Sequence, residues 1–541
     1  MGKAEQVSAD YVVVGAGSAG CAVAGRLAES GASVILLEAG GRDKSFLVRK
    51  PGMIGPMHAV PQLKAKFDWG YYSVPQEHIL GRKMPGVRGK VMGGSSAING
   101  MLFVRGNKQN YDDWAAEGCA GWGYDDVLPS FKKLETWEDG GSDLRGSGGP
   151  IHVVRRPDVT EASLEFQEAA SSTLGVPIVE DYNAGSQEGM SIFQESAKGG
   201  LRYSTSQGYV TELHPPSLHV RTGGTVSRIV IEGGRATGVE VLGRKGARQL
   251  IHAGKEVVVS AGVFGSAQIL MLSGVGPADH LVPLGIGVNA DLPVGDNLHD
   301  HLFVPSTWLM PNAVHRGTAG YFGKGLVKEL TRGGTFLAHT VFETAGFVRT
   351  SQATNVPDLQ IHVLPWAYPS PNQDAPVRHT VDNRAALTVM ATLIYPKSRG
   401  NVRLASSDPT AAPLIDPNYL ADESDRRLLV EGMAMVREIM GNPAIKGSVT
   451  GELHPGDAWT DATADHEVRN RATTVYHPVG TCRMGVDERA VVDPQLRVRG
   501  IEGLRVADAS VMPSITGGNT NAPAIMIGEH CAAIVLKGTQ R

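Results

Sequence analysis

Six residues near the N-terminus have the composition and spacing of a phosphate-binding turn. The segment Gly15-Ala16-Gly17-Ser18-Ala19-Gly20 fits the pattern GxGxxG and follows an apolar, β-branched run at residues 11–14. In such a turn the first glycine permits the tight bend, the second lets the backbone approach a pyrophosphate, and the third lets the next helix pack closely on the strand. The free amides of that helix then face the anion.

An acidic residue stands where a bound nucleotide would need one. Glu38 lies 18 residues after Gly20, at the end of a second β-branched run at residues 33–37. A carboxylate there can accept both ribose hydroxyls of an adenosine and would repel the additional phosphate of NADP. Strand, helix and strand together make a βαβ unit, so the sequence predicts a dinucleotide-binding domain.

Ser18 allows a rival interpretation of the same turn. The spacing of Ala16, Ser18 and Gly20 is similar to the GxSxG nucleophile elbow of serine hydrolases. However, Ala16 replaces the first glycine of that motif, and a hydrolase leaves Glu38 unexplained. We therefore favour nucleotide binding.

Two further groups of residues could bind a ligand, one a metal ion and the other a quaternary ammonium group. His299-Asp300-His301 offers two imidazoles and a carboxylate to a metal, but nothing nearby in the sequence completes a coordination sphere, so we interpret it as a structural segment and predict no metal. Glu343, with Trp366 and Tyr368, can form a carboxylate and aromatic site for a quaternary ammonium such as choline. A glutamate beside a strand is more often solvated or hydrogen-bonded, and the choline site remains an alternative.

These residues need a large framework, and the chain is long enough to supply one. It has 541 residues, 42% of them hydrophobic, and its formal charge of −4 excludes a strongly basic nucleic-acid-binding protein. The residue patterns predict helices within residues 111–117, 126–135 and 160–174, and strands within residues 219–232, 237–242 and 256–260. The Gly-, Pro- and Lys-rich residues 39–89 predict a long excursion across the surface. The apolar stretches 257–276 and 522–536 contain polar residues, so we expect buried strand or helix there and no transmembrane segment.

The cysteines and the N-terminus indicate a compartment. Cys21, Cys119, Cys482 and Cys531 form no CxxC pair, so neither a zinc ribbon nor a disulfide framework is encoded. Residues 1–9 are polar and lack the features of a secretory signal. We expect a cytoplasmic protein, and a peripheral association with an electron carrier at the inner membrane remains open.

Three later segments carry a family resemblance. Residues 89–101 (GKVMGGSSAINGM), residues 260–270 (SAGVFGSAQIL) and residues 476–485 (YHPVGTCRMG) together with residues 504–510 (LRVADAS) occur in the order found in the glucose–methanol–choline (GMC) flavin oxidoreductases. The chain resembles the bacterial choline and alcohol dehydrogenase branch over nearly its whole length, and least between about residues 306 and 400.

The resemblance implies an α/β fold, α+β overall. A Rossmann-like FAD-binding domain would comprise residues 1–158, 200–305 and 470–541. A discontinuous substrate-binding domain, built on an antiparallel sheet with helices, would comprise residues 159–199 and 306–469.

The resemblance also implies that FAD is the cofactor. A Gly-Gly-Ser-Ser loop supplies unhindered amides for phosphate or for the flavin ring, and residues 95–99 offer no His or Cys for a covalent bond, so we expect non-covalent FAD. The cofactor-binding residues implied by the turn and by the resemblance are Gly15, Gly17, Ser18, Ala19, Gly20, Glu38, Ala39, Trp69, Met92, Gly94, Ser95, Asn99, Gly100, Met101, Val226, Asp508, Ala509, Thr520 and Asn521.

Two catalytic residues follow from the same resemblance. His477 resembles the family's His-Pro-x-Gly-Thr position, and Asn519 resembles its partner position, 42 residues later. A neutral imidazole can take the hydroxyl proton of an alcohol at physiological pH. An amide N–H can donate to the same oxygen as it becomes alkoxide-like.

The resemblance thus implies FAD-dependent oxidation of a small-molecule alcohol to the aldehyde or ketone. His477 would be the general base, hydride would pass to flavin N5, and a quinone-type or artificial acceptor, or O2, would re-oxidise the flavin. The alternatives are a redox-neutral lyase with structural FAD, a choline-specific dehydrogenase or oxidase, and a noncatalytic flavoprotein. The sequence leaves the alcohol, the acceptor and the oligomeric state open.

Overall fold

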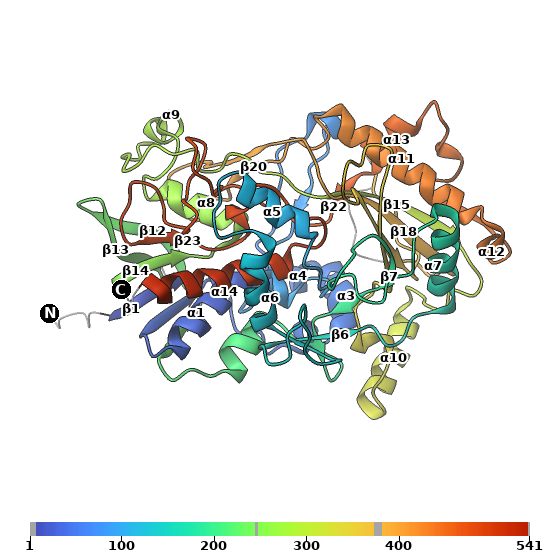
Figure 1. Cartoon of the computed structure of the whole chain (residues 1–541), viewed down its shortest axis with the longest axis horizontal. Helices are drawn as coiled ribbons and strands as arrows, with labels where there is room; N and C mark the ends of the chain where they lie inside the picture. Colours follow the sequence, from blue (N-terminus) through green and yellow to red (C-terminus); the bar gives the residue numbers. More distant parts are fainter. Residues whose placement is uncertain (1–6, 244–246, 373–380, 539–541) are drawn as a thin grey trace.

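The chain folds around two β-sheets that lie side by side in the computed structural model (Figure 1), which describes residues 7–243, 247–372 and 381–538. The first sheet has the order β11-β2-β1-β14-β13-β12, with β23 paired to β14. Its strands are β1 (Val7–Val14), β2 (Val34–Glu38), β11 (Leu218–Thr222), β12 (Thr225–Glu232), β13 (Arg235–Leu242), β14 (Arg248–Val259) and β23 (Leu504–Val506). Strands β11, β2, β1, β14 and β23 run parallel, as the βαβ pattern predicts.

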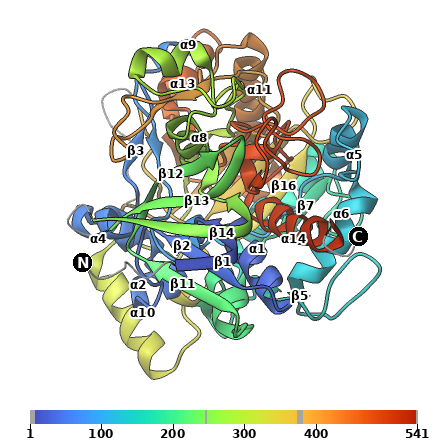
Figure 2. The same cartoon turned by 90° about the vertical axis from the view of Figure 1, so that its left-hand side faces the viewer.

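The centre of this sheet is buried on both faces. The β-branched run at the end of β1 is wholly buried, and so is every residue of β2. Helix α1 (Ser18–Glu29) packs against the long C-terminal helix α14 (Asn521–Gly538), and both views show them adjacent (Figure 2). The crossover through α1 brings the glycine turn to the carboxyl end of β1, which is where open parallel sheets bind nucleotides.

The second sheet is antiparallel, as expected. Its order is β21-β15-β18-β17-β16-β7, with β22 paired to β15. The strands are β7 (Gly189–Ile192), β15 (Leu302–Leu309), β16 (Thr344–Val348), β17 (Leu359–Leu364), β18 (Ala386–Leu393), β21 (Gly451–His454) and β22 (Thr473–Thr474). Helices α7 (Glu161–Leu174) and α11 (Glu423–Met440) pack together, α7 against β7 and α11 against β18. The predicted combination of a Rossmann-like sheet and an antiparallel sheet with helices is confirmed.

The excursion predicted at residues 39–89 is only partly a surface feature. It contains α2 (Phe46–Arg49), α3 (Ile54–Ala59) and α4 (Pro61–Phe67), which bury Val48, Met57 and Phe67 in a small core of their own. The prediction of a surface segment was wrong here, because glycine and proline shape short helices and turns without marking their burial.

The remaining sequence-based elements agree with the structure to within a few residues. Residues 219–232 form two strands rather than one, and residues 257–276 form the end of β14 followed by α8 (Gly262–Leu272). The other elements are β3 (Tyr71–Tyr72), β4 (Pro85–Gly86), α5 (Lys108–Ala116), α6 (Tyr124–Leu134), β5 (Glu135–Trp137), β6 (Ile151–Arg155), β8 (Gln194–Glu195), β9 (Ala197–Lys198), β10 (Leu201–Arg202), α9 (Ala278–Leu281), α10 (Ala319–Thr331), β19 (Asn401–Arg403), β20 (Leu414–Asp416), α12 (Pro443–Lys446) and α13 (Ala464–Arg471).

Within the described ranges, none of the helices combines the length and apolar character needed to cross a membrane. Most of the N-terminal segment that we examined for a secretory signal, residues 1–6, lies outside the described residues.

Candidate active site

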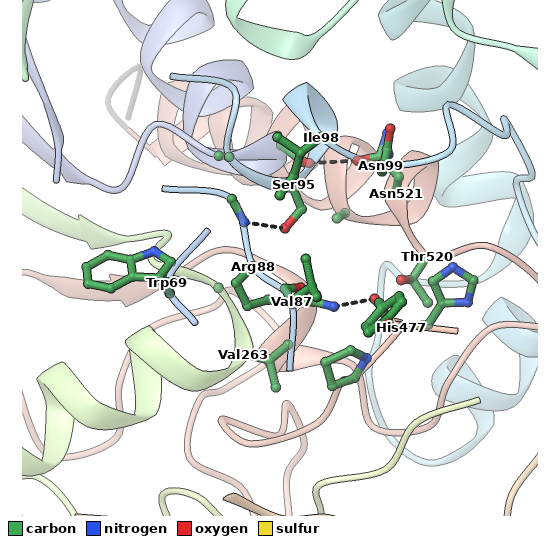
Figure 3. Close-up of a pocket in the computed structure, with 18 of the residues that line it drawn as sticks. Trp69, Val87, Arg88, Ser95, Ile98, Asn99, Val263, His477, Thr520 and Asn521 are labelled. Carbon is green, nitrogen blue, oxygen red and sulfur yellow. Dashed lines mark hydrogen bonds between the residues drawn. The ribbon is translucent and has the colours of Figure 1, made fainter. Parts of the chain in front are cut away.

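A cavity of about 430 Å³ joins the glycine turn to His477 and is lined by residues of both sheets. Figure 3 shows Trp69 and His477 at opposite sides of this pocket, with the segment of Ser95, Ile98 and Asn99 along another wall. The cavity therefore brings together the two chemistries that the sequence suggested, a phosphate cradle and a histidine.

At two glycines of the turn the structure leaves no room for a Cβ, and the third faces the cavity. Gly15 has φ +98°, and a Cβ there would lie 2.4 Å from the carbonyl oxygen of Ser260. A Cβ on Gly20 would lie 1.9 Å from the carbonyl oxygen of Gly15, so the helix packs directly on the turn. A Cβ on Gly17 would meet no protein atom closer than 4.0 Å, and Gly17 lines the cavity. The Gly17 backbone thus faces open space of the kind that a pyrophosphate needs.

Glu38 is buried beside this turn. Its carboxylate accepts the backbone N–H of Ala16 (3.1 Å) and of Gly40 (2.7 Å). Burial raises the pKa of Glu38 to about 7, although these two hydrogen bonds favour the ionised form. The carboxylate is positioned on the cavity wall, where it can also accept ribose hydroxyls.

Almost all of the predicted cofactor-binding residues line the cavity. Gly20 and Met92 do not: Gly20 packs on Gly15, and Met92 lies in the core around the first sheet. Those that do are Gly15, Gly17, Ser18, Ala19, Glu38, Ala39, Trp69, Gly94, Ser95, Asn99, Gly100, Met101, Val226, Asp508, Ala509, Thr520 and Asn521.

Two asparagines of the lining are held in defined orientations. The Asn99 Oδ1 atom accepts the Met101 N–H (2.9 Å) and an Arg202 N–H (2.8 Å), which leaves the Asn99 amide N–H groups as donors. Asn521, at the start of α14, accepts the hydroxyl of Ser18 at 2.7 Å. Because Ser18 belongs to the glycine turn, this hydrogen bond places Asn521 beside that turn.

His477 and Asn519 are in contact although 42 residues separate them. The Nδ2 atom of Asn519 lies 3.2 Å from Nε2 of His477, and both residues line the cavity. The Asn519 Oδ1 atom accepts an amide N–H of Gln360 at 3.4 Å, so the Asn519 amide N–H groups face His477. The two predicted catalytic residues therefore present a donor and an imidazole to one point.

A second histidine determines which nitrogen of His477 carries a hydrogen. Nε2 of His301 lies 2.9 Å from the carbonyl oxygen of Ile394, which can only accept, so this nitrogen is protonated. Burial lowers the pKa of His301 to about 3, so the ring is neutral and its Nδ1 atom accepts. That atom lies 3.0 Å from Nδ1 of His477, which must donate. Nε2 of His477 is left with its lone pair facing Asn519.

Burial and neighbouring charge keep His477 neutral. Burial is the largest cause that lowers the pKa of His477 well below its usual 6.5, and His301, His362 and the Arg88 guanidinium lower it further. His477 is thus an unprotonated base at physiological pH.

Asp300 and His301 hold His477 and do not form a metal site with His299. The Asp300 carboxylate accepts the backbone N–H of His477 (2.8 Å) and the hydroxyls of Thr474 (2.6 Å) and Tyr419 (2.6 Å). In the part of the chain that the structure describes, no three His, Cys, Asp or Glu side chains are grouped so that they could hold a metal ion. The structural interpretation of this segment missed its relation to His477, because that contact spans 176 residues.

Glu343 lies outside the cavity lining. Its carboxylate accepts an N–H of Arg156 (2.9 Å) and both the N–H (3.0 Å) and the hydroxyl (2.7 Å) of Thr160. Trp366 and Tyr368 do line the cavity. The carboxylate and the two aromatic rings of the possible choline site are therefore not brought together at one surface.

Several lining residues have no signal in the sequence. The buried Arg88 lines the cavity and donates to the backbone carbonyl of Tyr476 (Figure 3). Aromatic side chains surround the His477 end: Phe303, Phe322, Phe336, Phe342, Trp366 and Tyr368. In the sequence, Trp366 and Tyr368 were considered only together with Glu343, and the other four have the pattern of ordinary core residues. Only the fold shows that these six share a chamber.

Comparison with known proteins gives consistent matches over most of the chain. A family model described as GMC oxidoreductase matches residues 9–303, and a second with the same description matches residues 396–528. An oxygen-dependent choline dehydrogenase of Rhizobium johnstonii is 39% identical over 540 residues, which cover 98% of this chain and 96% of the relative. A protein of the same name from Brucella melitensis is 38% identical over 545 residues, with the same coverage.

Solved structures agree in fold over the full length. Pyridoxine 4-oxidase from Mesorbium loti superimposes with a TM-score of 0.85 at 29% identity, covering 97% of this chain and 98% of the other. A fungal aryl-alcohol oxidase superimposes with a TM-score of 0.84 at 26% identity, covering 99% and 100%.

Proposed function

The chain belongs to the GMC oxidoreductase family, and we propose that it oxidises its alcohol through His477 and Asn519. As a member of this family it is an FAD-dependent oxidoreductase that acts on the CH–OH group of a small-molecule donor. One observation carries the assignment of residues. The hydrogen-bond chain from Ile394 through His301 leaves Nε2 of His477 unprotonated at the cavity wall, beside the amide donor of Asn519.

The cavity residues fit FAD. The Gly17 backbone and the amino end of α1, which carries no side-chain cap, are donors for a pyrophosphate. Glu38 would accept the ribose hydroxyls, and the amide of Asn99 would donate to the flavin. We propose that the predicted cofactor-binding residues that line the cavity contact FAD, and that Gly20 and Met92 support them from behind. When bound, FAD supplies the hydride acceptor, its N5 atom.

The protein's own groups move the proton. Nε2 of His477 accepts the hydroxyl proton of the alcohol, while the Asn519 amide donates a hydrogen bond to the oxygen as negative charge develops on it. Loss of that proton promotes the departure of hydride from the carbinol carbon. Arg88 and burial make the resulting imidazolium unstable, which favours release of the proton to solvent after the reaction.

We also propose that FAD is bound without a covalent link, because residues 95–99 contain no His or Cys to form one. The expected division is a FAD-binding domain of residues 1–158, 200–305 and 470–541 and a substrate-binding domain of residues 159–199 and 306–469. The two sheets support it, although β15 crosses the limit at residue 305 and β22 pairs with β15 from the C-terminal segment.

For the electron acceptor and the location, we propose a quinone-type carrier, with O2 as the alternative, and a cytoplasmic protein that can associate peripherally with the inner membrane. All four cysteines are free and buried, which suits a reducing compartment. Rates with an artificial quinone and with air, measured side by side, separate the two acceptors.

A choline-specific activity is the second candidate. The names of the 39% identical relatives favour it, and so do the aromatic rings beside His477, since aromatic faces attract quaternary ammonium groups.

The test is reduction of the bound flavin by an alcohol without oxygen. Primary, secondary, aromatic and polyol alcohols are screened for bleaching of the flavin absorbance. We expect His477→Ala to lower kcat at least about a hundredfold with flavin still bound, and the exposed His219→Ala to behave as the wild type. Turnover without bleaching would instead indicate the redox-neutral lyase, and unchanged kcat in His477→Ala would remove His477 from its role.

A further inference from the structure

The substrate end of the cavity is a chamber of aromatic side chains, which we call the aromatic chamber: Phe303, Phe322, Phe336, Phe342, Trp366 and Tyr368. They form one cluster, in which the Trp366 ring lies 5.6 Å from that of Phe322 and 5.5 Å from that of Phe336. Aliphatic side chains fill the gaps, among them Leu364 and Met390.

The aromatic chamber opens on the catalytic histidine. Phe303 lies on β15, which begins directly after His301, and both Phe303 and His477 line the cavity. The Phe342 ring is 5.7 Å from the ring of His362, and both residues line the cavity with His477. A carbinol carbon near Nε2 of His477 therefore has its remaining substituents directed among these rings.

No carboxylate is available there among the described lining residues. The two that line the cavity, Glu38 and Asp508, belong to the nucleotide side: Asp508 accepts the Gly262 N–H (2.9 Å) and the Ser266 hydroxyl (2.6 Å) at the start of α8. Glu343 is bound to Arg156 and Thr160 behind the wall. Asp300 accepts the backbone N–H of His477 and the hydroxyls of Thr474 and Tyr419, but it is not among the lining residues. Arg88, which is cationic and lowers the pKa of His477, does line the cavity.

We propose that the substrate is an uncharged, apolar alcohol, an aryl or branched alkyl carbinol, and that the aromatic chamber excludes quaternary ammonium alcohols. This inference rests on the proposed function and narrows its substrate. Aromatic faces attract a cation, but burying an ion without a counter-charge is costly, and Arg88 repels it further. An apolar group of the same shape meets neither obstacle and gains from leaving water.

The experiment compares choline with its neutral isostere 3,3-dimethylbutan-1-ol, with benzyl alcohol as an aryl probe. The holoenzyme is assayed with an artificial acceptor and by anaerobic bleaching of its flavin. We expect kcat/KM for 3,3-dimethylbutan-1-ol to exceed that for choline at least about a hundredfold, since the two differ only in the buried charge. Equal values, or a preference for choline, would overturn the inference and leave the proposed function intact. Failure of every alcohol in the panel to bleach the flavin would overturn both.

A charge swap within the aromatic chamber gives an independent test. Phe303→Glu places a carboxylate beside the substrate, and Phe303→Gln is its neutral, matched control. The ratio of kcat/KM for choline to that for 3,3-dimethylbutan-1-ol should rise at least about tenfold in Phe303→Glu relative to Phe303→Gln. An unchanged ratio in a folded, flavin-bound pair would show that the missing counter-charge does not set specificity. The wild-type comparison stands alone if either variant fails to fold.

Discussion

The Nδ1 atoms of His301 and His477 lie 3.0 Å apart, and His301 holds its own hydrogen on the opposite nitrogen, toward Ile394. His301 therefore positions His477 and selects its tautomer, in the way that a buried acceptor orients the base of a hydrolytic triad. A base whose hydrogen sat on Nε2 would point a donor at the alcohol and could not take its proton.

We predict that His301→Leu lowers kcat by about 10- to 100-fold with flavin content unchanged, because most of the His477 rings would then adopt the wrong tautomer or orientation. His301→Gln should restore most of the loss, since its amide oxygen can accept from Nδ1 of His477. Kinetics on variants matched for flavin content measure both effects. Equal impairment of the two variants would mean that His301 contributes packing and does not select the tautomer of His477.

The pH dependence of turnover should reflect the lowered pKa of His477. A group whose pKa lies well below 6.5 remains unprotonated, and therefore active as a base, throughout pH 6.5–8. We expect kcat/KM to be flat across this range and to fall only at lower pH. Arg88→Met should move the acid limb to higher pH, because it removes a cation that disfavours the imidazolium. An acid limb near pH 7 or above in the wild type would contradict the neutral, buried histidine.

Binding of FAD should weaken as Glu38 takes up a proton. Burial raises the pKa of Glu38 to about 7, and only the ionised carboxylate can accept a ribose hydroxyl on each oxygen in addition to the backbone N–H that each already accepts. Titration of the apoprotein with FAD should give a Kd about tenfold higher at pH 6 than at pH 8, because the binding-competent form becomes the minor one. Glu38→Gln should bind more weakly than the wild type at pH 8 and lose this dependence. The same Kd at both pH values in the wild type would show that Glu38 is not the titrating contact.

The sequence alone identified the parts of the site whose residues lie close together along the chain. The GxGxxG turn and Glu38 are a few residues of one βαβ unit, and their spacing alone predicts their geometry. His477 and Asn519 followed from resemblance, since their contact depends on a fold that brings residue 519 beside residue 477.

The rest depends on contacts across the two sheets. His301 directly precedes β15 and contacts His477 only in the folded chain. In the sequence the same segment was considered as a metal site, and nothing within it indicates that His477 is its partner. Glu343 and Trp366 are near in the sequence but face different environments, because Arg156, from a distant segment, holds the carboxylate. In both cases the direction of the side chain in the fold, more than the residue type, determines which group it contacts.

The first turn of the chain offers a prediction that separates folding from cofactor binding. Gly17 has φ −82°, an ordinary value for any residue, and a Cβ on it would meet no protein atom closer than 4.0 Å. Gly17→Ala should therefore fold with near-native stability but lose FAD, because its methyl group enters the space facing the cavity. A Cβ on Gly20 would lie 1.9 Å from the Gly15 carbonyl oxygen, so Gly20→Ala should be destabilised by several kcal/mol, or fail to fold, whatever the cofactor. Thermal unfolding of apoprotein and flavin content after purification distinguish the two variants. Gly17→Ala that retains FAD at wild-type affinity would show that the pyrophosphate does not approach the backbone at this glycine.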